Sequence, residues 1–144
     1  MKPHGKKATI LCIEDQWNAL IGRKVLLEKM GYEVLEASDS DEGLRLFLSH
    51  AVDAVLVDYQ MPGTDGAVLA ALMKRLKPQV PIMLLSAYGP LPEKKLRSID
   101  TFFAKSQPPS LLLSALQGLL SGRDKPIFYR WLDQWKMRNH AGRV

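Results

Sequence analysis

Segments of strand length and helical repeats alternate along this chain, and the alternation constrains the fold more than any other feature. Strand-like segments occupy residues 8–13, 33–37, 54–57, 82–85 and 101–104. Between and after them, apolar residues recur at spacings of three and four, as on one face of a helix. Five such β-α units, with strands apolar on both faces, predict a parallel sheet covered by helices on both sides. The predicted fold class is therefore α/β, a doubly wound five-stranded sheet.

The helical repeats are not equally regular. The first predicted helix, residues 16–30, has an apolar stripe that Arg23 interrupts. Residues 91–98 predict only a short helix because Pro90 and Pro92 lie at its start, and residues 60–66, with one proline and two glycines, predict a loop. The stripes contain Ala19, Leu20, Leu26, Leu27 and Met30; Leu44, Phe47, Leu48 and Ala51; Leu69, Leu72, Met73 and Leu76; and Leu112, Ala115, Leu116 and Leu119.

Length and charge suggest one domain with a tail. The chain has 144 residues, 47% of them hydrophobic, and a net charge of +5. Residues 1–121 carry a net charge of +1 and form the predicted domain, whereas residues 122–144 carry +4. The basic character therefore belongs to the tail, and we expect no direct nucleic-acid binding.

Cysteine content and hydropathy exclude further classes. A single cysteine cannot form an internal disulfide or a multi-cysteine zinc site. No apolar run approaches the ~18 residues of a membrane span, and no signal peptide is evident. We therefore expect a cytoplasmic protein.

Polar residues follow four of the predicted strands. Glu14 and Asp15 follow the first strand, Asp58 the third, Ser86 the fourth and Lys105 the fifth. In a doubly wound sheet, ligands bind beyond the carboxyl ends of the strands. These side chains are therefore predicted to share one crevice.

The residue types suggest a chemistry, although each has an ordinary structural alternative. Asp15 alone is as typical of a helix cap, Asp58 of a turn and Lys105 of a solvated charge. Together, three carboxylates repel one another unless a cation is present, and hard oxygen ligands suit Mg²⁺. A lysine and a hydroxyl beside the metal would bind the oxygens of a phosphoryl group.

Other active sites lack their motifs. Neither G-x-G-x-x-G nor G-x-x-x-x-G-K-[ST] is present, which argues against dinucleotide and P-loop nucleotide binding. No serine has a credible histidine base, because His4, His50 and His140 do not follow strands. Cys12 lies inside the first strand and is expected to be an inert core thiol.

The chain resembles the receiver domains of two-component response regulators, including the chemotaxis type. The resemblance spans about residues 8–120 and rests on I-E-D at 13–15, V-D-Y-Q-M-P-G-T-D-G at 57–66, L-L-S-A at 84–87 and F-F-A-K at 102–105. Each motif is weak alone, whereas the four in order within one α/β frame are specific. The implied fold is the (βα)5 flavodoxin-like receiver fold.

The resemblance implies a role for each site residue. Asp58 would accept a phosphoryl group from a histidine kinase or histidine phosphotransfer protein, and Lys105 would pair with that group. Glu14 and Asp15 would form the acidic pair, with Asp15, Asp58 and the main-chain carbonyl of Gln60 binding Mg²⁺.

The resemblance also assigns switching residues. Ser86 would bind a phosphoryl oxygen and move on activation together with the aromatic Phe102. Gln60 and Tyr88 occupy positions that, in the family, tune the lifetime of the phosphorylated state.

The chain departs from the family at two places. Ser106 stands where the family commonly has a cis proline, and the isomer of the Lys105–Ser106 bond stays open because a cis bond to serine costs roughly 2.5–4 kcal/mol. The segment from Ser86 to Lys105 is shorter than usual by about one helical turn, which shortens the fourth helix.

The expected function is a stand-alone receiver that promotes its own phosphorylation and dephosphorylation but is not a turnover enzyme. Two alternatives stay open: a Mg²⁺-dependent phosphohydrolase with Asp58 as nucleophile, and a degenerate receiver that only binds a partner. The sequence names neither the kinase nor the output protein.

The tail forms a separate prediction. Phe128, Trp131, Leu132 and Trp135 lie at helical spacing, which predicts a basic amphipathic helix over residues 126–137 with both tryptophans buried against protein. Docking on its own domain, a dimer contact, a partner helix and a membrane surface are the alternatives. A dimer that forms through the face of the fourth helix, instead of through the tail, is a further possibility for the oligomeric state.

Overall fold

The computed structural model describes residues 7–89 and 91–121. The predicted tail helix over residues 126–137, with Trp131 and Trp135, lies outside the described residues. The strands are β1 (Thr9–Ile13), β2 (Glu33–Ala37), β3 (Ala54–Asp58), β4 (Gln60–Met61), β5 (Thr64–Asp65), β6 (Ile82–Ser86) and β7 (Thr101–Ala104). The helices are α1 (Trp17–Lys29), α2 (Ser40–Ser49), α3 (Gly66–Leu76), α4 (Glu93–Leu96) and α5 (Pro109–Leu120).

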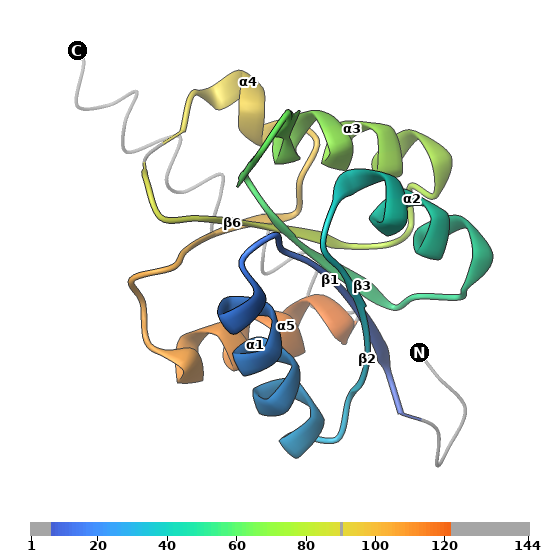
Figure 1. Ribbon diagram of the computed structural model, residues 1–144, viewed down its shortest axis with the longest axis vertical. Coiled ribbons are helices and arrows are strands. Elements are labelled where there is room, and N and C mark those ends of the chain that lie inside the picture. Colours follow the sequence, from blue (N-terminus) through green and yellow to red (C-terminus); the bar gives the residue numbers. More distant parts are fainter. Residues whose placement is uncertain (1–6, 90, 122–144) are drawn as a thin grey trace.

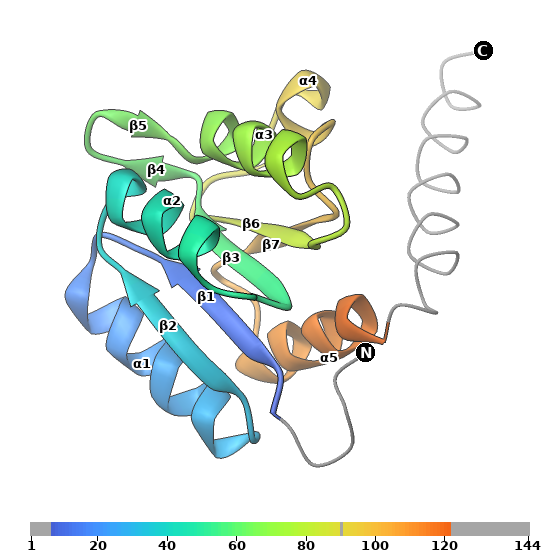
Figure 2. The ribbon, with the colours of Figure 1, turned by 90° about the vertical axis from the view of Figure 1, so that its right-hand side faces the viewer.

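Five strands form one parallel sheet in the order β2-β1-β3-β6-β7. Figures 1 and 2 show α1 and α5 on one side of this sheet and α2, α3 and α4 on the other. The chain winds outward from β1 to β2 and then returns to β3 on the other side of β1, so the order reverses between β1 and β3. The doubly wound parallel sheet predicted from the sequence is confirmed, and its switch point lies at the carboxyl ends of β1 and β3.

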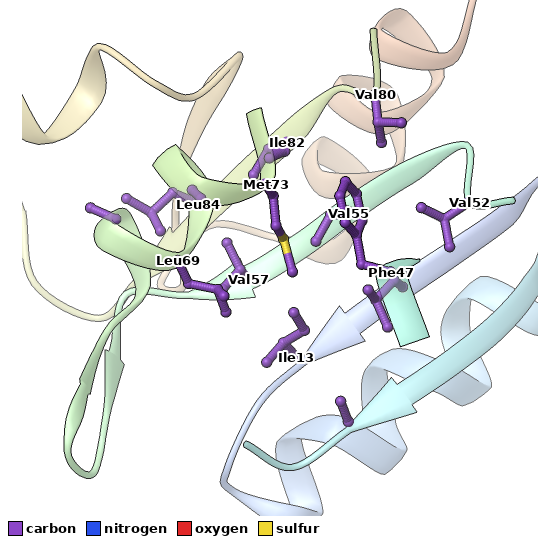
Figure 3. Packing of buried hydrophobic residues seen from close by; sticks show 14 of the residues in the cluster. Ile13, Phe47, Val52, Val55, Val57, Leu69, Met73, Val80, Ile82 and Leu84 are labelled. Atoms are coloured by element: carbon purple, nitrogen blue, oxygen red, sulfur yellow. The ribbon is translucent and has the colours of Figure 1, made fainter. Parts of the chain in front are cut away.

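The central strands β1, β3 and β6 contribute alternate residues to two cores, as the two-residue period of a strand requires. In β1, Ile10 and Cys12 face the core under α1 and α5, whereas Leu11 and Ile13 face the core under α2 and α3. Figure 3 shows the second core, where Phe47 and Met73 lie over residues of the central strands. Both faces of the sheet are therefore covered, which explains why the central strands are apolar throughout. The buried free thiol of Cys12 has its pKa raised to about 12, mainly by burial.

The helices bury fewer of their apolar residues than the sequence spacing predicted. Met30, Leu48, Leu72 and Leu76 were expected on buried faces, but they are 51%, 55%, 40% and 46% exposed. A helix that lies on one face of a sheet buries its central stripe, and residues at the margins of the stripe point past the sheet edge or between helices.

Residues 60–66, predicted as a loop, instead contain a small hairpin, and that prediction was wrong. β4 and β5 pair antiparallel, with Gln60 opposite Asp65 and Met61 opposite Thr64. The turn between them contains Gly63 at a φ of +71°. Two-residue strands show no alternation, so the sequence gives no strand signal here. Asp65 then caps α3 by accepting the Ala67 N–H at 2.7 Å.

Candidate functional site

The carboxyl edge of the sheet collects the polar residues that follow its strands. Glu14 and Asp15 directly follow β1, Asp58 ends β3, Ser86 ends β6 and Lys105 follows β7. The backbone N–H of Lys105 donates to the Ser86 carbonyl at 2.8 Å, which brings the ends of β6 and β7 together. The parallel topology thus places residues from four strands beside one another.

Three of these residues form an acidic cluster. Glu14, Asp15 and Asp58 each offer a carboxylate oxygen, and these oxygens lie within 4.8 Å of one another. Glu14 is 0% and Asp58 3% exposed, while Asp15 is half-buried. Carboxylates forced this close at a partly open edge fit a small divalent cation, and an all-oxygen set fits Mg²⁺.

The Lys105 ammonium lies between two members of the cluster. Its Nζ is 2.9 Å from Asp58 Oδ1 and 2.9 Å from Glu14 Oε1. Burial lowers the pKa of Lys105, but its hydrogen bonds to Asp58 and Glu14 and their negative charges outweigh burial and raise the pKa above its ordinary value. Lys105 is therefore a cation shared by two buried carboxylates.

The two buried carboxyls respond in opposite directions. Burial and the negative charge of Glu14 raise the pKa of Asp58 above its ordinary value, against the lowering effect of Lys105. Burial also raises the pKa of Glu14, but hydrogen bonds from Lys105 and the Gln16 N–H, with the charges of Lys105 and Arg23, bring it below its ordinary value. Negative charge at Asp58 is thus the less stabilised of the two.

The Ser86 hydroxyl is bonded within its own loop. It donates to the Tyr88 carbonyl and accepts the Tyr88 N–H at 3.0 Å. The Tyr88 side chain is 64% exposed. Phe102 on β7 lies against the same loop, since a Cβ added at Gly89 would be 3.4 Å from its Cζ. Ser86 and Phe102 thus both contact the short loop that follows β6.

Gln60 follows Asp58 closely in the chain, at the start of the β4–β5 hairpin. Its side chain is exposed on β4, and its residue pairs with Asp65 across the hairpin. Gly66 brings the backbone of α3 close to the site, because a Cβ there would be 2.1 Å from the carbonyl oxygen of Asp58. Gly66 was not predicted as a site residue from the sequence.

Arg23 is a second residue that the sequence analysis did not assign to the site. Its Nη1 lies 3.4 Å from Glu14 Oε1, with only 10% of the Arg23 side chain exposed. The signal was the interruption of the α1 stripe, which reflects this ion pair. Arg23 and Lys105 also line a pocket of about 340 Å³ between α1 and α5.

The comparisons identify the family. The family model of the response regulator receiver domain matches residues 10–117, which is most of the chain. The chain therefore belongs to the response regulator receiver domains, the phosphoacceptor modules of two-component systems. None of the helices that the structure describes is long and apolar enough to cross a membrane.

Curated relatives include proteins of different length. The chain is 31% identical over 118 residues to the phosphate regulon transcriptional regulatory protein PhoB of Pseudomonas aeruginosa, covering 78% of this chain and 51% of PhoB. It is 30% identical over 99 residues to sporulation initiation phosphotransferase F of Bacillus subtilis, covering 67% of this chain and 80% of that protein. The chain thus spans about half the length of PhoB.

Solved structures show the same fold. A CheY-like receiver domain from Methanospirillum hungatei has a TM-score of 0.78 at 26% identity, covering 84% of this chain and 99% of that one. The response regulator TrrA of Thermotoga maritima, solved in complex with Mg²⁺-BeF, has a TM-score of 0.75 at 30% identity. The match covers 78% of this chain and 99% of the TrrA chain. TrrA has also been solved in complex with the histidine kinase ThkA.

Proposed function

We propose that Asp58 accepts a phosphoryl group from a histidine kinase or histidine phosphotransfer protein. In this transfer the bond from phosphorus to the donor's imidazole nitrogen breaks, and a bond to an Asp58 carboxylate oxygen forms. The observation that carries the proposal is the position of Asp58: a buried carboxylate 2.9 Å from the Lys105 ammonium within a cluster of three acids. Phosphoryl transfer needs positioning and charge neutralisation of this kind.

The acidic cluster would hold Mg²⁺ through Asp15, Asp58 and the main-chain carbonyl of Gln60, with Glu14 beside it. Oxygen atoms of three carboxylates within 4.8 Å fit this ion. Bound Mg²⁺ supplies positive charge against the phosphoryl oxygens during transfer. The complex of the relative TrrA with Mg²⁺-BeF supports this assignment.

The other site residues would respond to the phosphorylated state. Lys105 already contacts Asp58 and is the cation that would pair with a phosphoryl oxygen. Ser86 would exchange its bonds to Tyr88 for one to that group, and Phe102, which contacts the same loop, would follow. Exposed Gln60 and Tyr88 would tune how long the phosphoryl group persists.

Residues 1–121 would act as the receiver domain, and the consequence of phosphorylation would be altered partner binding. The ThkA–TrrA complex supports a histidine kinase as one partner. A stand-alone receiver with residues 122–144 as a separate tail stays a prediction.

The test is intact-mass measurement after incubation with acetyl phosphate and Mg²⁺. We expect a shift of one phosphoryl group, absent in Asp58→Asn and in excess chelator. Asp15→Asn should also lose it, because a metal ligand is removed. Asp41→Asn, which changes an acidic residue in the first turn of α2, is the matched control and should be phosphorylated normally.

Three results would contradict the proposal. Phosphorylation that persists in Asp58→Asn would place the acceptor elsewhere. Continued turnover of a small phosphoester would favour the phosphohydrolase. Failure of the wild-type protein to bind Mg²⁺ or to gain mass would favour a degenerate receiver that only binds a partner.

A further inference from the structure

Glu14 has two cationic partners, one more than a single buried carboxylate requires. Its Oε1 accepts from Lys105 Nζ at 2.9 Å and from Arg23 Nη1 at 3.4 Å, while its Oε2 accepts the Gln16 N–H at 3.2 Å. The Glu14 side chain is 0% exposed. Both oxygens of this carboxylate are thus bonded without any ligand.

The two cations differ in what else they contact. Lys105 also lies 2.9 Å from Asp58 Oδ1, whereas the one acidic partner of Arg23 among the described residues is Glu14. Under the proposed function, Lys105 moves its bond to the phosphoryl group on Asp58. Glu14 would then lose its closest cation, and an unpaired buried carboxylate is strongly destabilising. Arg23 on α1 is the cation that remains.

We propose that Arg23 is a positioning residue, the permanent counter-ion of Glu14, which frees Lys105 for the phosphoryl group and weakens the attraction of the acidic cluster for Mg²⁺. The inference rests on the proposed function. With Arg23, three carboxylates and two cations have a formal charge of −1, and without it the charge is −2. Arg23 therefore affects metal binding and phosphorylation in opposite directions.

The test compares Arg23→Gln with wild type in the full chain. Glutamine keeps length and hydrogen-bonding capacity but removes the charge. The Kd for Mg²⁺, measured by titration calorimetry at fixed ionic strength, should fall about threefold to tenfold, as expected for removing one unit charge near a cation in a partly solvated site. Phosphorylation by acetyl phosphate at saturating Mg²⁺ should become slower, because Glu14 retains Lys105.

Two variants distinguish this role from simple damage. Arg23→Lys keeps the charge and should restore the wild-type Kd for Mg²⁺. Lys24→Gln is the matched control, because Lys24 is the next residue on α1, loses the same charge and pairs with Glu36 at 3.5 Å. Its Kd should change less than about twofold, because Lys24 pairs with Glu36 and not with a member of the acidic cluster. A damaged fold would weaken metal binding and phosphorylation together.

The outcomes separate the two proposals. If wild type binds Mg²⁺ and Arg23→Gln binds it equally or more weakly, the role of Arg23 is wrong while the proposed function stands. If wild type neither binds Mg²⁺ nor is phosphorylated, the proposed function is wrong and the inference is overturned with it. Tighter Mg²⁺ binding with slower phosphorylation in Arg23→Gln, reversed in Arg23→Lys, supports both.

Discussion

Two aspartate–lysine pairs lie at opposite edges of the same sheet. At the amino edge, Lys74 Nζ is 2.6 Å from Asp100 Oδ2, and at the carboxyl edge Lys105 Nζ is 2.9 Å from Asp58 Oδ1. The lysine side chains are 20% and 25% exposed, and the aspartate side chains are 11% and 5% exposed. Residue types, distances and burial are therefore similar, so the difference between the pairs lies in their surroundings.

The amino-edge pair is completed by backbone. Asp100 Oδ2 also accepts the Ile82 N–H at 2.7 Å, and Lys74 donates to the Val80 carbonyl at 2.8 Å. One carboxylate meets one ammonium, and both bind the segment that enters β6. This pair satisfies strand-end backbone groups and has no excess charge to attract a ligand.

The carboxyl-edge pair has excess negative charge. Lys105 is shared between Asp58 and Glu14, and Asp15 offers a third carboxylate within the same cluster. Like charges at this spacing favour a bound cation. An aspartate–lysine pair therefore has a structural role where backbone groups complete its hydrogen bonds, and it can bind a cation where further carboxylates surround it.

The largest expected effect is a loss of stability when Gly66, whose backbone packs against Asp58 at the carboxyl edge, is replaced by alanine. In Gly66→Ala, the new Cβ would lie 2.1 Å from the carbonyl oxygen of Asp58 and 2.8 Å from its carbonyl carbon. Backbone cannot move aside as a flexible side chain can, so urea unfolding should show a loss of about 3 kcal/mol or more. The result would show that the close packing of α3 against the backbone of Asp58 stabilises the fold.

A matched control exists in α5. Gly118 is helical and has nothing within 4 Å of an added Cβ, so Gly118→Ala should raise the free energy of unfolding by about 0.5–1 kcal/mol. Equal stability of Gly66→Ala and wild type would mean that α3 can shift away from Asp58 at no cost.

The second prediction compares the stability of two variants, each with one of the two aspartates replaced. Asp100→Ala leaves the Ile82 N–H without its acceptor and removes the carboxylate that pairs with Lys74, so we expect a loss of about 2–3 kcal/mol in urea unfolding. Asp58→Asn relieves the carboxyl edge of one negative charge while Lys105 keeps Glu14. Its free energy of unfolding should stay within about 1 kcal/mol of wild type or rise. The comparison fails if Asp58→Asn is the more destabilising variant.

The third prediction uses pH in metal-free buffer. Burial and the charge of Glu14 raise the pKa of Asp58 in the native state. As pH rises past the ordinary aspartate pKa of about 3.9, the unfolded state releases this proton first, so stability falls until the higher native pKa is passed. The free energy of unfolding of wild type minus that of Asp58→Asn should therefore decrease from about pH 4 upward and then level off. A difference that rises with pH would reverse the sign assigned to Asp58.

Sequence reasoning predicted the features that depend on topology. The strands were visible as local runs, and a parallel sheet brings the residues after β1, β3, β6 and β7 to one edge whatever the loops do. Asp58 and Lys105, which are 47 positions apart in the numbering, were therefore predicted as neighbours. That prediction needed no knowledge of side-chain geometry.

The features that depend on side-chain geometry were not predicted. The direction of the Ser86 hydroxyl toward Tyr88 depends on a rotamer and a loop conformation. The contact of Arg23 with Glu14 was visible only as an interrupted stripe, since one helix-facing position looks the same whether its partner is solvent or a carboxylate. The close approach at Gly66 depends on the β4–β5 hairpin, for which the sequence gives no periodic signal.

The smallest expected effect concerns a third aspartate–lysine pair, between Asp65 and Lys95, which joins the start of α3 to α4. Burial raises the pKa of Asp65, but hydrogen bonds from Lys95 and the Ala67 N–H outweigh burial and hold the pKa below its ordinary value. Because α4 has no buried residue, we expect Lys95→Gln to leave global unfolding in urea unchanged but to speed amide hydrogen exchange in residues 93–99.

Lys94→Gln, one exposed position earlier, is the control and should leave that exchange unchanged. The Asp65–Lys95 pair has a backbone partner in the Ala67 N–H, but it joins two helices and is not part of the acidic cluster. It would be a local tether whose removal loosens only the segment beside the proposed switch. Unchanged exchange in Lys95→Gln would mean that the packing of Leu91 and Ile99 against the core holds α4 without it.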